Sequence, residues 1–99
     1  VKVTTRSSYI KEVFHLYMLI VENRDELVDY LRANRVDAKI HYPTLMHLQP
    51  AAKSYCYSKG DFPVAERLAK NCISLPVHEF VTKSEIERMA DIIHKFYKQ

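Results

Sequence analysis

The sequence has almost no glycine: Gly60 is the only one in 99 residues. A loop that holds phosphate groups through its backbone N–H groups depends on several glycines, so a glycine-rich nucleotide-binding loop is excluded. Tryptophan is absent as well, and seven tyrosines and four phenylalanines supply the large apolar side chains. With 47% hydrophobic and 27% charged residues, the composition is that of one small globular domain over residues 1–99.

Long apolar runs and targeting signals are also missing. The longest apolar stretch, Val13 to Val21, is interrupted by His15 and is far shorter than the roughly 20 residues of a membrane-spanning helix. The first residues have no apolar signal core and no initiator methionine, which suggests a fragment or a processed chain. Cys56 and Cys72 fit no known spacing and indicate free thiols in a reducing compartment, so we expect a cytoplasmic protein without membrane contact.

A strong excess of one charge is missing too. The chain has 15 basic and 12 acidic residues, which give a net charge of +3, and the signs are mixed along the chain. The densest basic segment, residues 94–98, is short, whereas a nucleic-acid-binding protein usually has a concentrated basic stripe. These charges are typical of a solvated surface, and we expect no nucleic-acid partner.

The signals that are present predict an α+β fold. The run from Val13 to Val21 is rich in aromatic and β-branched residues, which favours a strand buried on both faces. Asn23 with Glu26, and Thr82 with Glu85, have the spacing of capping boxes and mark the starts of two helices. In chain order we expect a strand at 13–21, a helix at 23–34, a strand at 36–41, a long loop at 42–61, a helix after residue 61, an extended segment at 73–77 and a helix from residue 82. This order predicts a two-layer sandwich, in which a small, mostly antiparallel sheet has helices on one face.

The last of these helices has an apolar stripe. Its members are Ile86, Met89, Ala90, Ile93 and Tyr97, which recur at helical spacing. A stripe of this kind normally faces the core of a globular protein, so we predict that these residues are buried.

The run from His41 to Pro50 carries the densest polar chemistry of the chain. This polar loop reads His41-Tyr42-Pro43-Thr44-Leu45-Met46-His47-Leu48-Gln49-Pro50. Pro43 and Pro50 each remove a backbone donor and favour extended geometry at the preceding residue, so neither a helix nor a strand runs through it. A stiff loop with imidazole and phenol side chains is a typical place for a binding site.

A zinc site is an alternative use of the same histidines. His41 and His47, with Cys56 or His78, are suitable ligand types, but their spacing matches no compact zinc motif, so we expect no metal. Nothing in the sequence marks Cys56 or Cys72 as an activated nucleophile, because no base or oxyanion donor is recognisable beside them. We expect Cys72 to be a buried, inert thiol and no residue of this chain to be catalytic.

Several short runs occur along the chain in a distinctive order. They are Phe14-His15-Leu16-Tyr17, Asn23-Arg24-Asp25-Glu26-Leu27, His41-Tyr42-Pro43, His47-Leu48-Gln49-Pro50, Gly60-Asp61-Phe62-Pro63-Val64-Ala65-Glu66, Ser74-Leu75-Pro76-Val77-His78 and residues 82–86. In this order and spacing, they resemble the C-terminal portion of the DegT/DnrJ sugar aminotransferases. Those proteins are pyridoxal-phosphate enzymes of the aspartate-aminotransferase fold type.

The resemblance implies that the chain is the C-terminal domain of a larger, homodimeric enzyme and closes one wall of its substrate cleft. Such enzymes transfer an amino group from glutamate or glutamine to a nucleotide-linked keto-sugar, and the lysine that binds pyridoxal phosphate lies in the larger N-terminal domain. The resemblance also implies that His41, Tyr42 and His47 face the sugar-nucleotide region. On this interpretation the chain alone is inactive and binds no cofactor.

The residues by themselves leave other functions open. A free-standing α+β module for binding or oligomerisation would have the same architecture. A small zinc-binding or nucleic-acid-binding domain would use the same histidines or basic residues. The presence of an upstream domain with a Schiff-base lysine would favour the aminotransferase over the free-standing module. A zinc assay would test the zinc-binding domain.

Overall fold

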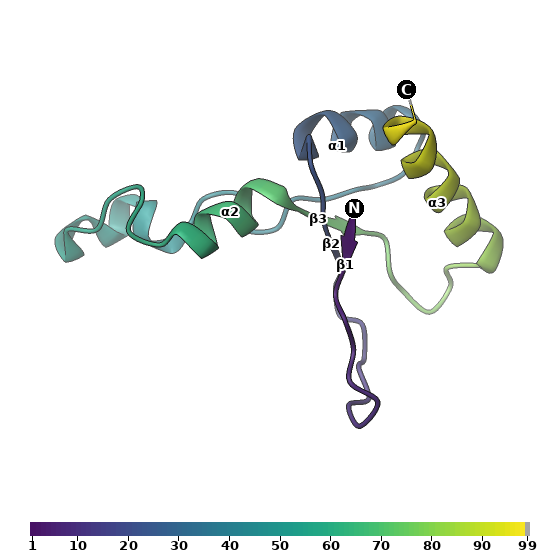
Figure 1. The fold of residues 1–99 in the computed structure, drawn as a ribbon, viewed down its shortest axis with the longest axis horizontal. Helices are drawn as coiled ribbons and strands as arrows, with labels where there is room; N and C mark the ends of the chain where they lie inside the picture. Colours follow the sequence, from purple (N-terminus) through teal and green to yellow (C-terminus); the bar gives the residue numbers. More distant parts are fainter. Residues whose placement is uncertain (99) are drawn as a thin grey trace.

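The computed structural model of this chain describes residues 1–98. Its elements are β1 (Lys2–Val3), β2 (Tyr17–Ile20), α1 (Arg24–Ala33), the short 3-10 helices η1 (Met46–Leu48) and η2 (Pro50–Tyr55), α2 (Pro63–Asn71), β3 (Cys72–Leu75) and α3 (Lys83–Tyr97). Figure 1 shows α1 and α3 close to the sheet and α2 extending away from it.

The three strands form one antiparallel sheet in the order β1-β2-β3. Leu19 of β2 pairs with Val3 on one side and with Ile73 on the other. Leu19 and Ile73 are buried in one cluster with the apolar side chains of α1 and α3. The predicted α+β fold, with a small antiparallel sheet and helices, is therefore confirmed.

The first predicted strand is shorter than expected, and its partner was not foreseen. Phe14 has a left-handed backbone with a φ of 52°, which interrupts extended geometry, so β2 begins only at Tyr17. Of β2, only Leu19 is buried, rather than both faces of the strand. The residues that precede this predicted strand, 1–12, contain β1, whose two residues were too few to give a sequence signal.

The strand predicted at 36–41 is wrong. Arg35 has a left-handed φ of 60°, and the Ala38 N–H donates to the Val36 carbonyl, so the segment turns instead of extending. What remains is an isolated bridge between Lys39 and Ser74 at the free edge of β3. That bridge brings the beginning of the polar loop to the sheet.

The core lies between the sheet and helices α1 and α3. Leu27, Val28 and Leu31 of α1 are buried, as their spacing predicted. Burial of one such side chain contributes about 1.5–3 kcal/mol relative to full exposure. The core is therefore built from the two helices that cover the sheet, and it excludes α2.

Of the two predicted capping boxes, the one at α3 is present and the one at α1 is not. At α3 the prediction is confirmed, because Thr82 Oγ1 accepts a hydrogen bond from the Glu85 N–H and Glu85 Oε2 accepts one from the Thr82 N–H. At α1 it is wrong: Asn23 has a left-handed φ of 50°, and its side chain makes no capping hydrogen bond. Capping spacing alone could not reveal that backbone geometry.

The predicted stripe of α3 is only partly buried. Met89 and Ile93 lie in the core, together with Ile92, but Ile86 is 54% exposed and Ala90 and Tyr97 are exposed as well. The core-facing side of α3 is thus rotated from the predicted one, and part of its apolar stripe lies open.

Two segments project from the sheet and helices, as Figure 1 shows. One is the connection from residue 4 to residue 16, where Arg6 lies over the rings of Phe14 and Tyr17 at 4.9 and 5.2 Å. The other is the arm, residues 42–71, in which no residue as a whole is buried. The radius of gyration is 15.8 Å, against about 13 Å for a compact domain of this size. Within residues 1–98, no helix is both long and apolar enough to span a membrane.

Candidate functional site

The polar loop begins at an anchor on the free edge of β3. Lys39 and Ser74 exchange backbone hydrogen bonds of 3.0 and 2.8 Å. His41 Nδ1 lies 2.8 Å from Ser74 Oγ, and Ser74 is buried, with only 4% of its surface exposed. Because a hydroxyl and an imidazole nitrogen can each donate or accept, this bond holds the ring and leaves Nε2 for another partner.

Tyr42 follows this anchor in a conformation that is unusual for its residue type. Its φ is 57°, in the left-handed region, and Pro43 comes next. A residue before proline normally has extended geometry, so this backbone is held by its surroundings. The phenol is 80% exposed. The loop therefore presents the Tyr42 ring to solvent at a fixed position beside His41.

A second anchor holds the middle of the polar loop against the arm. His47 Nε2 lies 3.1 Å from Glu66 Oε1, and the same oxygen accepts a 2.7 Å hydrogen bond from the Gly60 N–H. The His47 ring also packs on Phe62, with 4.8 Å between ring centres. Only 8% of the His47 side chain and 18% of the Glu66 side chain are exposed. Three segments of the arm meet at this carboxylate.

These contacts shift the acidity of Glu66. The Gly60 N–H is the largest cause that lowers the pKa of this carboxyl group below its ordinary value. Partial burial raises the pKa and opposes the shift, while the hydrogen bond to His47 and the Phe62 N–H lower it further. Glu66 is therefore ionised at neutral pH and accepts the hydrogen bond that His47 Nε2–H donates.

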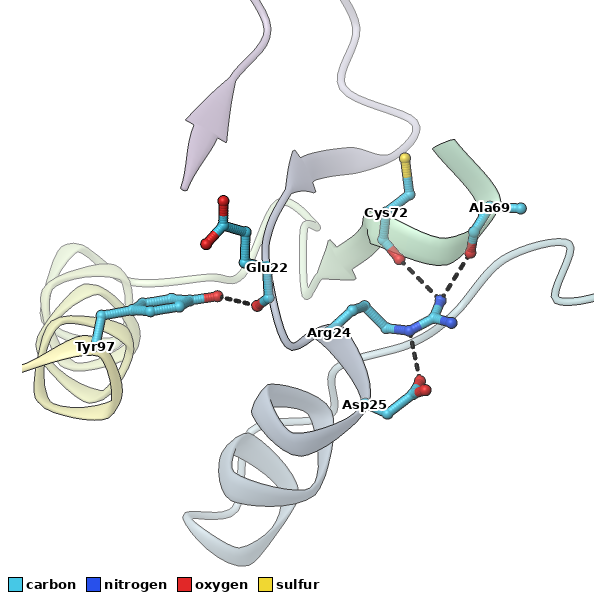
Figure 2. A network of polar contacts seen from close by, with 6 residues as sticks. All are labelled: Glu22, Arg24, Asp25, Ala69, Cys72 and Tyr97. Atoms are coloured by element: carbon cyan, nitrogen blue, oxygen red, sulfur yellow. Dashed lines mark hydrogen bonds and ion pairs between the residues drawn. The ribbon is translucent and has the colours of Figure 1, made fainter. Parts of the chain in front are cut away.

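The root of the arm is fixed by Arg24, as Figure 2 shows. Arg24 Nη1 donates to the carbonyls of Ala69 and Cys72 at 3.1 and 3.3 Å, and Nε pairs with Asp25 at 2.6 Å. The guanidinium group pairs with a carbonyl in the last turn of α2, which the helix leaves unpaired, and with the first carbonyl of β3. Arg24 thus joins the start of α1 to the junction between α2 and β3.

Two weakly acidic groups lie in the same region and have raised pKa values. Burial is the main cause that raises the pKa of the Cys72 thiol, and Arg24 opposes it. Partial burial also raises the pKa of Tyr97, with the charge of Glu22 as a smaller cause, and the phenol donates to the Glu22 carbonyl at 2.6 Å. Cys72 is only half-buried, so its predicted burial is wrong, and the raised pKa keeps its thiol protonated at neutral pH.

The predicted site residues are therefore held in two places. His41 and Tyr42 lie at the sheet edge, whereas His47 lies in the arm, and within residues 1–98 no hydrogen bond joins any of the three to another. In each imidazole, one ring nitrogen takes part in the hydrogen bond of its anchor, and that bond leaves the second nitrogen unused. Whether these side chains contact a substrate remains a prediction.

Sequence reasoning missed the residues that position this loop. Ser74 is a hydroxyl inside the apolar run of β3, and a polar residue in such a run was a signal available beforehand. Glu66 and Arg24 gave no such signal, because both are ordinary surface residue types whose partners lie far away in sequence.

Two kinds of site can be checked among the described residues, a metal-ligand cluster and a lysine suited to a Schiff base. Within residues 1–98, no group of three or more His, Cys, Asp or Glu side chains could hold a metal ion. Every lysine of the chain is exposed. A lysine that forms a Schiff base is usually desolvated or lies beside another cation. The exposed lysines of this chain therefore lack the surroundings of a lysine that binds pyridoxal phosphate.

Comparison with known proteins gives a consistent family match. The sequence model of the DegT/DnrJ/EryC1/StrS aminotransferase family matches residues 1–94. The erythromycin biosynthesis sensory transduction protein EryC1 of Saccharopolyspora erythraea is 40% identical over 77% of this chain and 21% of its own length. The dTDP-3-amino-3,4,6-trideoxy-alpha-D-glucose transaminase of Streptomyces venezuelae is 33% identical over 85% of this chain and 22% of its own length.

A solved structure agrees in fold. The crystal structure of S. venezuelae DesV in complex with a ketimine intermediate matches 98% of this chain with a TM-score of 0.90 and 29% sequence identity. The match covers 26% of the DesV chain. The present chain therefore spans about a quarter of the length of the proteins that it matches.

Proposed function

This chain belongs to the DegT/DnrJ/EryC1/StrS aminotransferase family, and we propose on that premise that it is the C-terminal, cleft-closing domain of a nucleotide-sugar aminotransferase. The complete enzyme transfers an amino group from glutamate or glutamine to a nucleotide-linked keto-sugar. The observation that carries the proposal is that nearly the whole of this fold recurs inside a four-times longer chain crystallised with a ketimine intermediate.

The polar loop is the proposed contact with the nucleotide sugar. His41 has one ring nitrogen engaged by its anchor, so the other nitrogen can meet a phosphate or sugar oxygen. The proposal gives the same role to the second ring nitrogen of His47, whose side chain is only 8% exposed in this chain. The exposed Tyr42 phenol supplies a further donor beside His41. These groups bind and orient the sugar; the proposal gives them no part in bond making.

The cofactor belongs to the rest of the enzyme in this proposal. Pyridoxal phosphate supplies the amino-transfer chemistry when it is bound, and its lysine lies in a larger N-terminal domain, because the exposed lysines of this chain do not fit that role. The complete enzyme is a cytoplasmic homodimer, and this chain contributes one wall of its cleft.

Activity of the longer protein tests the function directly. With pyridoxal phosphate, glutamate or glutamine, and a nucleotide-linked keto-sugar, mass spectrometry should detect the corresponding amino-sugar. Absence of amino-sugar across a panel of such substrates, in a protein that forms an internal aldimine, would reject the proposed substrate class.

Variants of the polar loop test its role in that enzyme. His41→Ala and His47→Ala should each raise the KM for the keto-sugar roughly 2- to 10-fold, since one hydrogen bond is worth ~0.5–1.5 kcal/mol. The donor half-reaction, followed by stopped-flow absorbance, should change little. Lys53→Ala, an exposed change on η2, is the matched control. A large loss in the donor half-reaction would instead assign the histidine to cofactor chemistry, and an unchanged KM would leave it a structural role.

A further inference from the structure

An apolar groove remains open on the helix-covered side of the sheet, between β1 and α3. Val3 pairs with buried Leu19 and faces the same side, yet Val3 is 48% exposed, so the helical cover ends before β1. Ile86 of α3, which is 54% exposed, also lines the groove. The groove encloses about 500 Å³.

The chemistry of the groove excludes a charged ligand. Among the described residues that line it, none is a lysine, arginine, aspartate or glutamate, and the polar side chains are those of Tyr17, His78 and His94. A nucleotide sugar carries phosphate charges that need cationic or multiple N–H partners. The aliphatic walls, which include Leu19, Met89 and Ile93, instead match an apolar partner.

The place of the first residue indicates which partner this is. Val1 itself lines the groove and is 61% exposed. Any polypeptide that precedes Val1 in a longer protein enters at this groove, and consecutive elements of a chain usually pack beside each other. The family relatives have about three-quarters of their length outside the part that matches this chain.

We propose that this groove is the docking surface for an amphipathic helix of the polypeptide that precedes Val1 in the complete enzyme. The inference rests on the proposed function, in which this domain is one part of a longer chain. A helix beside α3 completes the helical layer over β1, since one sheet face is normally covered across its whole width. It buries Val3 and Ile86, whose exposure has no other reason in the described structure.

Thiol accessibility in the complete protein tests the proposal. Ile86→Cys lies in the groove, and Glu87→Cys, on the neighbouring exposed side chain, is the matched control. Maleimide labelling at position 86, followed by mass spectrometry of the peptide, should be roughly tenfold slower or more than at position 87, because a covered thiol reacts only when the interface opens. In urea the two rates should be equal. Equal rates in the native protein would overturn the proposal.

Cross-linking of the protein with its native side chains intact identifies the occupant and does not depend on the folding of a variant. Photo-methionine in place of methionine puts a reactive carbene at Met89, on the groove wall. The expected product joins the Met89 peptide to a peptide upstream of Val1 in the same polypeptide, at every protein concentration. Cross-links only between two copies, only to a lipid, or only within residues 1–99 would overturn the proposal. Neither readout uses amino transfer, so failure here is distinct from failure of the proposed activity.

Discussion

At the scale of single residues, Glu66 has the widest influence on the candidate site. Its Oε1 atom accepts hydrogen bonds from Gly60 and His47, which lie in different segments of the arm. Because the pKa of Glu66 is lowered in the folded chain, chiefly by the Gly60 N–H, its ionised form stabilises the folded loop. That stabilisation is fully present above the unfolded pKa of the group and is lost as the pH falls through the lower, folded pKa.

The titration of Glu66 can be followed at one atom. Gly60 is the only glycine of the 99-residue chain, so labelling with ¹⁵N-glycine gives a single backbone amide signal. We expect this amide shift to titrate with a midpoint below 4.5, the ordinary pKa of the group, because the amide donates directly to the carboxylate.

Glu66→Gln is the control for this titration, because an amide side chain has no proton to lose in this range. The shift of the Gly60 amide should then be flat through the same pH window. A midpoint at or above 4.5 in the unaltered chain would contradict the lowered pKa of Glu66.

At the scale of elements, the attachment of the arm depends on Arg24. Arg24→Ala removes the donors to the carbonyls of Ala69 and Cys72 in a part-buried position. Hydrogen bonds to a charged group contribute roughly 1.5–3 kcal/mol, so we expect a loss of that order in the free energy of unfolding by urea.

Asp25→Ala separates this effect from the neighbouring ion pair. Asp25 is 81% exposed, and an exposed ion pair contributes only about 0–1 kcal/mol. Its loss should therefore be clearly smaller than that of Arg24→Ala. Equal losses for the two variants would show that the carbonyl contacts of Arg24 contribute little.

Helix α3 offers a test of the core. Ile93 is 6% exposed and lies in the hydrophobic cluster, so Ile93→Ala should lower the free energy of unfolding by roughly 2–4 kcal/mol, as large-to-small core changes do. Lys95→Ala on the exposed side of the same helix should change it little. Urea titration of both variants measures the difference, and similar losses would mean that the buried face of α3 is misassigned.

At the scale of the whole molecule, two projecting segments and an open groove distinguish this chain from a compact domain. In the arm no residue as a whole is buried, and the radius of gyration of 15.8 Å exceeds the value of about 13 Å for a compact domain of this size. The helices and sheet form a core, whereas the arm and groove expose apolar surface that a larger assembly would cover.

The chain by itself should fold and yet have no transaminase chemistry. We expect that mixing it with pyridoxal phosphate gives no stoichiometric aldimine, because every lysine is exposed and none is set apart by its surroundings. Absorbance spectroscopy, followed by borohydride reduction and peptide mass spectrometry, measures this. A stoichiometric adduct at a single lysine would contradict the expectation.

Sequence alone determined the features that depend on neighbours in the chain. The capping box of Thr82 and Glu85 and the buried stripe of α1 follow from interactions a few residues apart. So does the lack of an α-helix or strand between the prolines of the polar loop, where only the short 3-10 helix η1 forms. The resemblance in short runs led to the family, which the match to residues 1–94 confirms.

The tertiary structure decided what depends on partners distant in the chain. The His41 contact with Ser74 spans 33 residues, and the contact of Arg24 with Cys72 spans 48. The left-handed backbone at Phe14 and the exposure of Ile86 likewise could not be seen in the local sequence pattern. Local pattern gives each residue its preferred element and face, but only packing selects which part of an apolar stripe is covered and which polar group meets a donor.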